Sequence, residues 1–335
     1  MLWLQFLVCS LIIVASGVTL SKYGDVLAEK TGLGGAWIGL ILMASVTSLP
    51  ELIAGISSVV MVNAPDIAVG AVMGSCVYNI AILAFMDILN GRKPLFATAG
   101  VGHLISAGFG IILISIVILS MHLVDILPSL GYIGLYTPVI VVVYLLAVRC
   151  AYFYERKVVA EFVEDVNVKL NYGEITMKRA ILGYSLSAAV IIAAATWLPF
   201  IADALGEQTG LGRTFMGSFF VGMTTSLPEL VVSITAVRIG ATDMAIANLL
   251  GSNLFNVLVL AVDDLFYTKG PILSHVTSTH GTIGLFAVIM TAVVVVGLIY
   301  RPEKKPFLSF CWSSIALIFI WTLSVLALYL LGSAA

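Results

Sequence analysis

The chain has 335 residues, of which 61% are hydrophobic and only 10% are charged, and its mean hydropathy is +1.12. This composition excludes an ordinary soluble protein, because soluble domains carry about 25% charged residues. The formal net charge of −2 also argues against a nucleic-acid-binding surface. The sequence therefore predicts a protein whose solvent is the lipid bilayer.

Ten apolar stretches are long enough to cross a hydrocarbon core of ~30 Å, which takes roughly 20 helical residues. The first has no basic residue ahead of it and no small-residue cleavage pattern after it, so we expect a membrane helix rather than a signal peptide. In chain order the expected helices lie near residues 2–21, 34–61, 67–89, 99–121, 126–149, 179–202, 211–237, 244–267, 277–300 and 307–331. The predicted fold is an all-α integral membrane protein with ten transmembrane helices.

The second expected helix contains an ionisable residue, Glu51, well inside its apolar run. Such a group costs on the order of 3 kcal/mol in a bilayer, and by default it is a functional candidate. Thr47 lies four residues earlier on the same helical face, and Ser48 lies one turn from the carboxylate. Because Pro50 cannot donate a hydrogen bond to the carbonyl of Val46, we expect a kink that leaves carbonyl oxygens free for a cation.

The third expected helix carries Ser75 and Asn79 at positions i and i+4, directly after Gly74. The glycine would permit a close approach by a second helix. Hydroxyl groups in membrane helices also bond to the carbonyl four residues earlier or join helices, so each Ser and Thr has a structural alternative.

A charged stretch, residues 151–177, separates the fifth and sixth expected helices. We expect a solvated linker on the inner face of the membrane. It is too short to hold a regulatory domain.

The second half of the chain repeats the first. The segment DALGEQTGLG at residues 203–212 is similar to DVLAEKTGLG at residues 25–34. The motif TSLPEL occurs twice, at 47–52 and at 225–230. Five expected helices in each copy is an odd number, so the second copy must enter the membrane upside down. We therefore predict a first five-helix repeat at 1–150, a charged cytoplasmic linker at 151–177 and a second, inverted five-helix repeat at 178–335. Transporters built in this way bind substrate near the bilayer midplane, between the repeats.

The polar pattern of the first repeat recurs in the second. Its equivalent candidates are Thr225, Ser226, Glu229, Ser252 and Asn256. Pro228 is expected to kink its helix as Pro50 does, by leaving the carbonyl of Thr224 without a donor. Thr224 itself is a weaker extra candidate.

The basic residues predict the orientation. With the N-terminus outside, all of the 16 lysines and arginines except Arg213 and Lys269 would lie on the inner side. The positive-inside rule favours this arrangement over its inverse. We therefore expect a multi-pass protein of the cell (plasma) membrane with both termini outside.

Two carboxylates, several hydroxyls, two amide oxygens and freed carbonyls form an all-oxygen set. Such a set suits hard cations such as Ca²⁺ or Na⁺. The charge of the two glutamates matches one Ca²⁺ or two or more Na⁺, so the two occupancies would exclude one another electrostatically. That property is what an antiporter needs. The alternative is a buried structural network or a protonated pair of glutamates.

The other ionisable residues have simpler interpretations. Asp66 and Asp243 fall near helix starts, where capping is the main interpretation and attraction of cations at a pore mouth the alternative. Asp87, Asp263 and Asp264 lie towards helix ends and can reach the interface, and the four histidines show no ligand spacing. The four cysteines show no zinc or disulfide pattern, so we interpret them as small apolar side chains.

Two copies of TSLPEL, each followed by GSxxxN in the next helix, resemble the cation/Ca²⁺ antiporter superfamily, and in particular its small prokaryotic sodium/calcium exchangers. The resemblance covers essentially the whole chain. It implies one Ca²⁺ site with adjoining Na⁺ sites, with Glu51 and Glu229 as principal Ca²⁺ ligands. It also implies carbonyl ligands at Ala44 and Gly222 and a sliding pair formed by the first and sixth helices. The complete expected ligand set is Ala44, Thr47, Ser48, Glu51, Ser75, Asn79, Gly222, Thr225, Ser226, Glu229, Ser252 and Asn256.

The chain departs from the family pattern at two points. Val46 and Thr224 stand where the family usually has glycine, so site geometry or ion preference can differ. Potassium-dependent relatives have Asp at the place of Asn256, and proton-coupled relatives carry GNxxE instead of GSxxxN. Asn256 and the GSxxxN pattern therefore disfavour potassium dependence and obligatory proton coupling.

The leading hypothesis is secondary antiport of Na⁺ against Ca²⁺ through one alternately exposed site. Ca²⁺/H⁺ exchange and a passive Ca²⁺ channel are the alternatives. We expect no enzyme activity, because no nucleophile or metalloprotease motif is present. No cofactor, nucleotide or nucleic acid is expected beyond the transported ions and the lipid bilayer, and the sequence is compatible with a monomer.

Overall fold

The computed structural model describes residues 1–30, 46–90, 94–124, 126–162, 174–238, 240–301 and 311–332, and these are almost entirely helical. The α-helices are α1 (Leu2–Lys30), α3 (Leu49–Ser57), α4 (Pro65–Leu89), α5 (Leu95–Thr98), α6 (His103–His122), α7 (Tyr136–Phe162), α8 (Met177–Thr209), α9 (Gly212–Phe215), α10 (Gly222–Thr225), α11 (Leu227–Arg238), α12 (Thr242–Phe266), α13 (Thr279–Tyr300) and α14 (Trp312–Gly332). The other elements are the π-helices η1 (Ser58–Val62) and η2 (Met216–Val221), the 3₁₀-helix η3 (Ile272–His275) and the strands β1 (Ser129–Leu130) and β2 (Ile133–Gly134).

Within the described ranges, nine helical segments are long and apolar enough to cross a membrane. Each overlaps one of the expected stretches. The remaining stretch, 34–61, is described only from residue 46 and contains the shorter apolar helix Leu49–Val62. An all-α integral membrane protein is therefore confirmed, and the count of ten helices stays a prediction.

The fifth expected helix begins later than the hydropathy indicates. It was expected near residues 126–149, but α7 starts at Tyr136 because a short antiparallel hairpin, β1–β2, occupies the preceding residues. Gly131 supplies the positive φ of +70° that the turn of this hairpin requires. At its other end α7 continues to Phe162, so residues 151–162 of the expected linker are helical.

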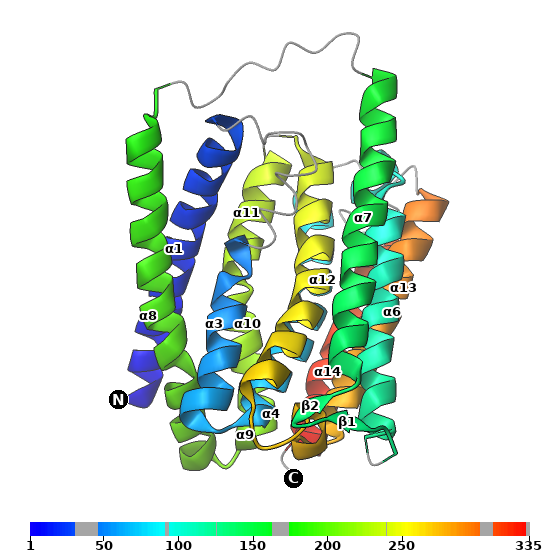
Figure 1. The fold of residues 1–335 in the computed structure, drawn as a ribbon. Coiled ribbons are helices and arrows are strands. Elements are labelled where there is room, and N and C mark those ends of the chain that lie inside the picture. The colour runs from blue at the N-terminus through cyan, green and yellow to red at the C-terminus, as the bar shows by residue number, and fades with distance from the viewer. Residues whose placement is uncertain are drawn as a thin grey trace.

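Helices at equivalent places in the two halves run in opposite directions (Figure 1). α1 runs upward from the N-terminus whereas α8 descends, and α7 runs upward whereas α14 descends. α1 begins and α14 ends at the same end of the bundle. These directions agree with the inversion predicted from the sequence.

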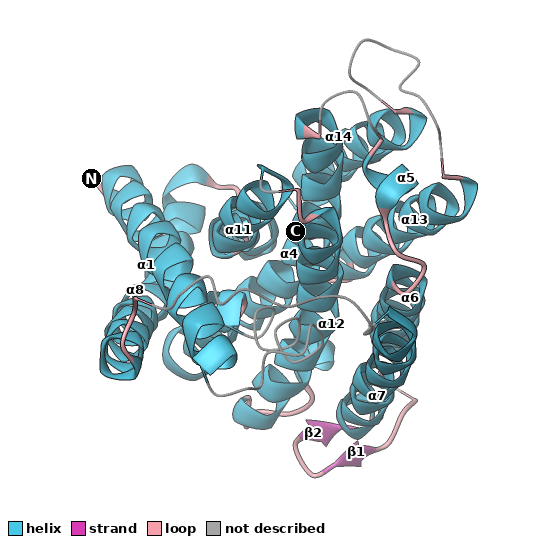
Figure 2. Cartoon of the chain, turned by 90° about the horizontal axis from the view of Figure 1, so that it is seen from above, coloured by secondary structure: helices cyan, strands magenta, loops and turns pink. Residues whose placement is uncertain are grey.

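Viewed along the bundle, α4 and α12 lie near the centre, and they are the most deeply buried of the spans (Figure 2). α6, α7, α13 and α14 surround them on one side, where one large apolar core is formed. α1 and α8 pack along each other at the opposite side and form a second apolar cluster with α3 and residues of α4 and η2. The described chain therefore has a broad core and a separate helix pair beside it.

Two buried aspartates make equivalent hydrogen bonds near the C-terminal ends of the central helices α4 and α12. Asp87 accepts hydrogen bonds from the amide of Leu95 at 2.7 Å and the hydroxyl of Ser314 at 2.5 Å. Asp264 accepts equivalent bonds from Ile272 at 2.7 Å and Thr137 at 2.5 Å. Both aspartates are fully buried, so the expectation that they reach the interface is wrong. Their matching partners support the repeat.

Two aspartates that we interpreted as helix caps instead join the repeats. Asp66 accepts a hydrogen bond from the amide of Thr277 at 2.9 Å and lies 3.0 Å from Nε2 of His280. Asp243 lies 2.8 Å from Nε2 of His103. Neither α4 nor α12 has a side-chain cap at its N-terminus. The capping interpretation is therefore wrong, because these carboxylates bond to the opposite half of the chain.

Candidate cation site

The two glutamates follow breaks in their helices. α3 starts directly after Ser48, and α10 ends and α11 begins on either side of Ser226. Both serines have backbone angles near the end of a helical turn, with φ/ψ of −88°/13° and −84°/0°. Each break lies two residues before a proline, which cannot donate to the preceding turn. The predicted interruptions are therefore confirmed.

Each glutamate is bound by a serine of the opposite repeat. The hydroxyl of Ser48 donates to Oε1 of Glu229 at 3.0 Å, and that of Ser226 donates to Oε1 of Glu51 at 3.5 Å. Ser252 adds a third bond to Glu229 at 3.4 Å. All five side chains are at most 2% exposed. The two repeats thus share one carboxylate cluster inside the bundle.

Four buried oxygen atoms of the expected ligands have no hydrogen-bond partner among the described residues. They are Oε2 of Glu51, Oε2 of Glu229, Oδ1 of Asn79 and Oδ1 of Asn256. A buried acceptor without a partner is costly, and a hard cation is the kind of partner that such oxygens accept. In the described part of the chain no three His, Cys, Asp or Glu side chains come together as a metal site. A cation here would therefore depend on hydroxyl and amide oxygens as much as on carboxylates.

The hydroxyls of Ser75 and Thr225 lie beside the carboxylates and 3.4 Å from each other. Thr225 donates to the carbonyl of Val221 at 3.1 Å, and Ser75 donates to the carbonyl of Gly222 at 3.1 Å. Both hydroxyl oxygens keep lone pairs for a cation. The Gly222 carbonyl also accepts from the amide of Ser226 at 3.2 Å, so a cation bound there would compete with Ser75. Its expected counterpart, Ala44, lies outside the described residues.

Close packing around the glycines brings these helices together. A methyl group at Gly74 would collide with the backbone of Ser218 in η2, and one at Gly222 would lie 3.0 Å from the amide of Ser75. The prediction that Gly74 permits a close helix approach is confirmed. A side chain at either position would separate α4 from the chain that carries Thr225 and Glu229.

Sequence reasoning missed two asparagines of α12. Asn248 lies 3.5 Å from the hydroxyl of Thr47 and donates to Ser233 at 3.3 Å. Asn253 contacts Asn79 and the backbone of Cys76. Asn248 precedes Ser252 by four residues, so a search for polar residues on one face of α12 would have found it.

Thr224, the polar residue where the family usually has glycine, contacts α1. The hydroxyl of Thr224 lies 3.1 Å from that of Ser10 in α1, and Ser10 also donates to the carbonyl of Phe6 at 2.8 Å. Thr224 therefore bonds to the α1–α8 pair.

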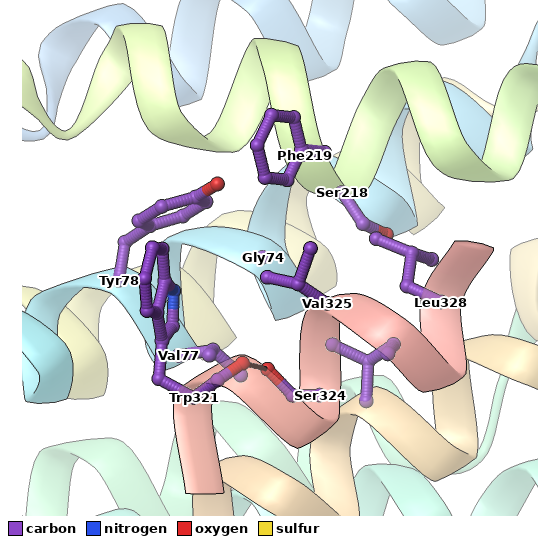
Figure 3. A pocket seen from close by; sticks show the side chains of 10 residues that line it. Gly74, Val77, Tyr78, Ser218, Phe219, Trp321, Ser324, Val325 and Leu328 are labelled. Carbon is purple, nitrogen blue, oxygen red and sulfur yellow. Dashed lines mark hydrogen bonds between the residues drawn. The ribbon is translucent and has the colours of Figure 1, made fainter. Parts of the chain in front are cut away.

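A separate surface pocket lies between α4, η2 and α14, where Tyr78, Ser218 and Trp321 are among the lining residues (Figure 3). It contains none of the expected ligands. The carboxylate cluster, rather than this pocket, is the candidate cation site.

The chain is similar to known proteins both in sequence and in fold. The family described as sodium/calcium exchanger protein matches residues 1–148 and 179–330. "Sodium/calcium exchanger MaX1" of Methanosarcina acetivorans is 25% identical over 299 residues, covering 73% of this chain and 77% of that protein. "Inner membrane protein YrbG" of Escherichia coli is 26% identical over 265 residues, covering 78% of each.

Two solved structures share the fold. The H⁺/Ca²⁺ exchanger CAX has a TM-score of 0.72 at 13% identity and covers 99% of this chain and 85% of its own. The sodium-calcium exchanger NCX_Mj has a TM-score of 0.63 at 18% identity and covers 96% of each chain. These likenesses concern the arrangement of the helices.

Proposed function

The chain belongs to the sodium/calcium exchanger family, and from this premise we propose that it exchanges Na⁺ for Ca²⁺ across a membrane as a secondary antiporter. It is a multi-pass integral membrane protein, and members of its family are transporters rather than enzymes. Family and structural neighbours together support Ca²⁺ antiport. The choice of Na⁺ as coupling ion is the step that we add.

One observation carries the proposal: Glu51 and Glu229, from opposite repeats, meet inside the bundle, and one carboxylate oxygen of each has no partner among the residues that the structure describes. Two negative charges attract one Ca²⁺ or two or more Na⁺, and neither set can enter while the other is bound. Ca²⁺ and Na⁺ would therefore compete for the same oxygens. Competition at one site is the requirement for coupled exchange.

The ligands around the carboxylates favour Na⁺ over H⁺ as the driving ion. A proton needs only a carboxylate oxygen, whereas Na⁺ needs several oxygen ligands. The cluster offers hydroxyls from Ser48, Ser75 and Ser252. The expected ligands Asn79 and Asn256 add amide oxygens that have no partner in the described part of the chain. Ca²⁺/H⁺ exchange is the second candidate, because two carboxylates in one buried cluster can also take up protons and the fold of the CAX exchanger is similar.

Alternating access would use the α1–α8 pair. These helices form their own apolar cluster and contact the interrupted helices through α3, α10 and α11. Sliding of the pair against the core would expose the carboxylate cluster to one side of the membrane and then the other. No cofactor takes part in this scheme. We place the protein in the cell membrane with both termini outside, on the distribution of its basic residues.

The test uses purified protein in vesicles loaded with Na⁺ and diluted into Na⁺-free medium that contains radioactive Ca²⁺. Na⁺-driven uptake is the expected result, and Glu51→Gln and Glu229→Gln should each abolish it. A pH gradient is imposed separately in Na⁺-free vesicles. Uptake driven by the pH gradient alone would overturn Na⁺ coupling.

The same vesicles separate the other possibilities. A channel would let Ca²⁺ equilibrate with no counter-ion gradient. Unchanged exchange in both glutamine variants would remove Glu51 and Glu229 from the site. The variants are first compared with the native protein by gel filtration, so that loss of folding is recognised.

A further inference from the structure

The two asparagines of the expected ligand set have different neighbours in the two repeats. Asn79 ends the motif GSCVYN of α4, and Asn256 ends the motif GSNLFN of α12. The third residue of the motif is therefore Cys76 in the first repeat and Asn253 in the second. Each of these third residues contacts the asparagine of the opposite repeat.

Asn253 is held by two hydrogen bonds whose directions are fixed. Its Nδ2 donates to the backbone carbonyl of Cys76 at 3.1 Å. A backbone carbonyl can only accept, so this end of the Asn253 amide must be the nitrogen. The other end is then the oxygen, and it accepts from Nδ2 of Asn79 at 3.0 Å. One carbonyl therefore determines the orientation of both amides.

The consequence for Asn79 is that its own oxygen is turned away from Asn253. This oxygen is buried and has no hydrogen-bond partner among the described residues. Asn79 lies one turn after Ser75, whose hydroxyl contacts Thr225 in the carboxylate cluster. Asn79 therefore has only its amide oxygen, and never its amide nitrogen, free for a cation.

The second repeat lacks this constraint. The side chain of Cys76 lies beside the amide of Asn256, but a thiol is only a weak donor and a weak acceptor. Both polar atoms of the Asn256 amide are without a strong partner in the described structure. Asn256 can therefore turn either its oxygen or its nitrogen to the site.

We propose that Asn253 is a positioning residue that fixes the Asn79 amide with its oxygen towards the cation, while Cys76 leaves the Asn256 amide free to turn. The cation site then has one preset amide ligand and one adjustable amide ligand. This inference rests on the proposed function, because it assumes that Ca²⁺ or Na⁺ is the ligand. Residues that orient a metal ligand typically contribute 10–100-fold in metal affinity.

The experiment measures the Ca²⁺ concentration dependence of exchange for the native protein, Asn253→Cys and Cys76→Asn. Asn253→Cys reproduces in the second repeat the side chain that the first repeat already has. We expect it to raise the KM for Ca²⁺ about tenfold, with a smaller change in maximal rate. Cys76→Asn should bond to the backbone of α12 as Asn253 bonds to that of α4, fix Asn256 and lower the KM severalfold.

An unchanged KM in Asn253→Cys, or a loss of maximal rate alone, would overturn the positioning role. Cys76→Asn removes no native hydrogen bond of Asn253, so it tests the idea even if Asn253→Cys does not fold. An unchanged KM in Cys76→Asn would overturn the adjustable role of Asn256. If the native protein shows no Na⁺-driven exchange, the proposed function fails separately, and the same variants are then compared by calorimetric titration with Ca²⁺.

Discussion

The hydroxyl of Ser48 donates a 3.0 Å hydrogen bond to Oε1 of Glu229, so a side chain of the first repeat orients the carboxylate of the second. The mirror contact, from Ser226 to Glu51, is longer at 3.5 Å. Glu229 has a further donor in Ser252 at 3.4 Å. The two halves of the site therefore differ in how firmly their carboxylates are held, although their motifs are the same.

This asymmetry predicts unequal effects of two matched substitutions. Ser48→Ala removes the shortest bond to Glu229, and a hydrogen bond to a charged group is worth about 1.5–3 kcal/mol. We expect the KM for Ca²⁺ to rise at least about tenfold. Ser226→Ala removes a longer bond and should raise it less. Ca²⁺ uptake by vesicles at graded Ca²⁺ measures both, and an equal effect would contradict the asymmetry.

A second prediction concerns the contact between the helix pair and the core. A methyl group at Gly17 of α1 would lie 2.6 Å from Cγ of Pro228, one residue before Glu229. Overpacking of this kind typically costs about 1–3 kcal/mol. Gly17→Ala should therefore lower the maximal rate of exchange by roughly tenfold, because α1 can no longer pack against α11 as it does in this structure.

The matched control for this prediction is Gly108→Ala. A methyl group at Gly108 of α6 would meet no described atom within 4 Å outside the neighbouring backbone of its own helix. Its exchange rate and melting temperature should equal those of the native protein. If Gly17→Ala also transports at the native rate, then the α1–α11 contact does not limit exchange.

The doubled motif was enough to predict the polar cluster, because ionisable and amide side chains at equivalent places in apolar helices have few other uses. The serines and glutamates of the two motifs do lie together in the fold. What the motif could not predict is which repeat supplies the partner of each glutamate. Helical spacing pairs Thr47 with Glu51 locally, whereas the serine contacts cross between the repeats.

Other contacts escaped the sequence because their partners are far apart along the chain. His280 lies 214 residues from Asp66, and His103 lies 140 residues from Asp243. Ligand spacing within one helix says nothing about such pairs. The inversion itself supplies the missing signal, since each aspartate and each histidine has an equivalent in the other repeat and they pair crosswise.

A third prediction follows from the exposure of these two pairs. The side chains of Asp66 and His280 are 21% and 0% exposed, whereas that of Asp243 is 58% exposed. A double-mutant cycle with alanine at Asp66 and His280 should give a coupling free energy of unfolding of about 1–2 kcal/mol. The cycle for Asp243 and His103 should give under about 1 kcal/mol, because solvent screens the carboxylate. Thermal unfolding in detergent measures both. Equal couplings would contradict the argument from burial.

The last prediction separates stability from transport at Asp264. This buried carboxylate accepts four hydrogen bonds, from the hydroxyls of Tyr136 and Thr137 and from the amides of Gly134 and Ile272. Each of its two oxygens therefore accepts from two donors. Asp264→Asn turns an amide nitrogen towards two of these donors, and the loss should be about 3 kcal/mol or more of unfolding free energy.

Thr137→Val provides the graded comparison, because it removes a single donor and should cost about 1–2 kcal/mol. Asp264 lies eight residues beyond Asn256 on α12, which is about 12 Å along the helix. At temperatures where both variants stay folded, the KM for Ca²⁺ should therefore equal the native value. A raised KM in folded Asp264→Asn would contradict this expectation. It would mean that the hydrogen bonds of Asp264 affect the cation site through α12, which also carries the expected ligands Ser252 and Asn256.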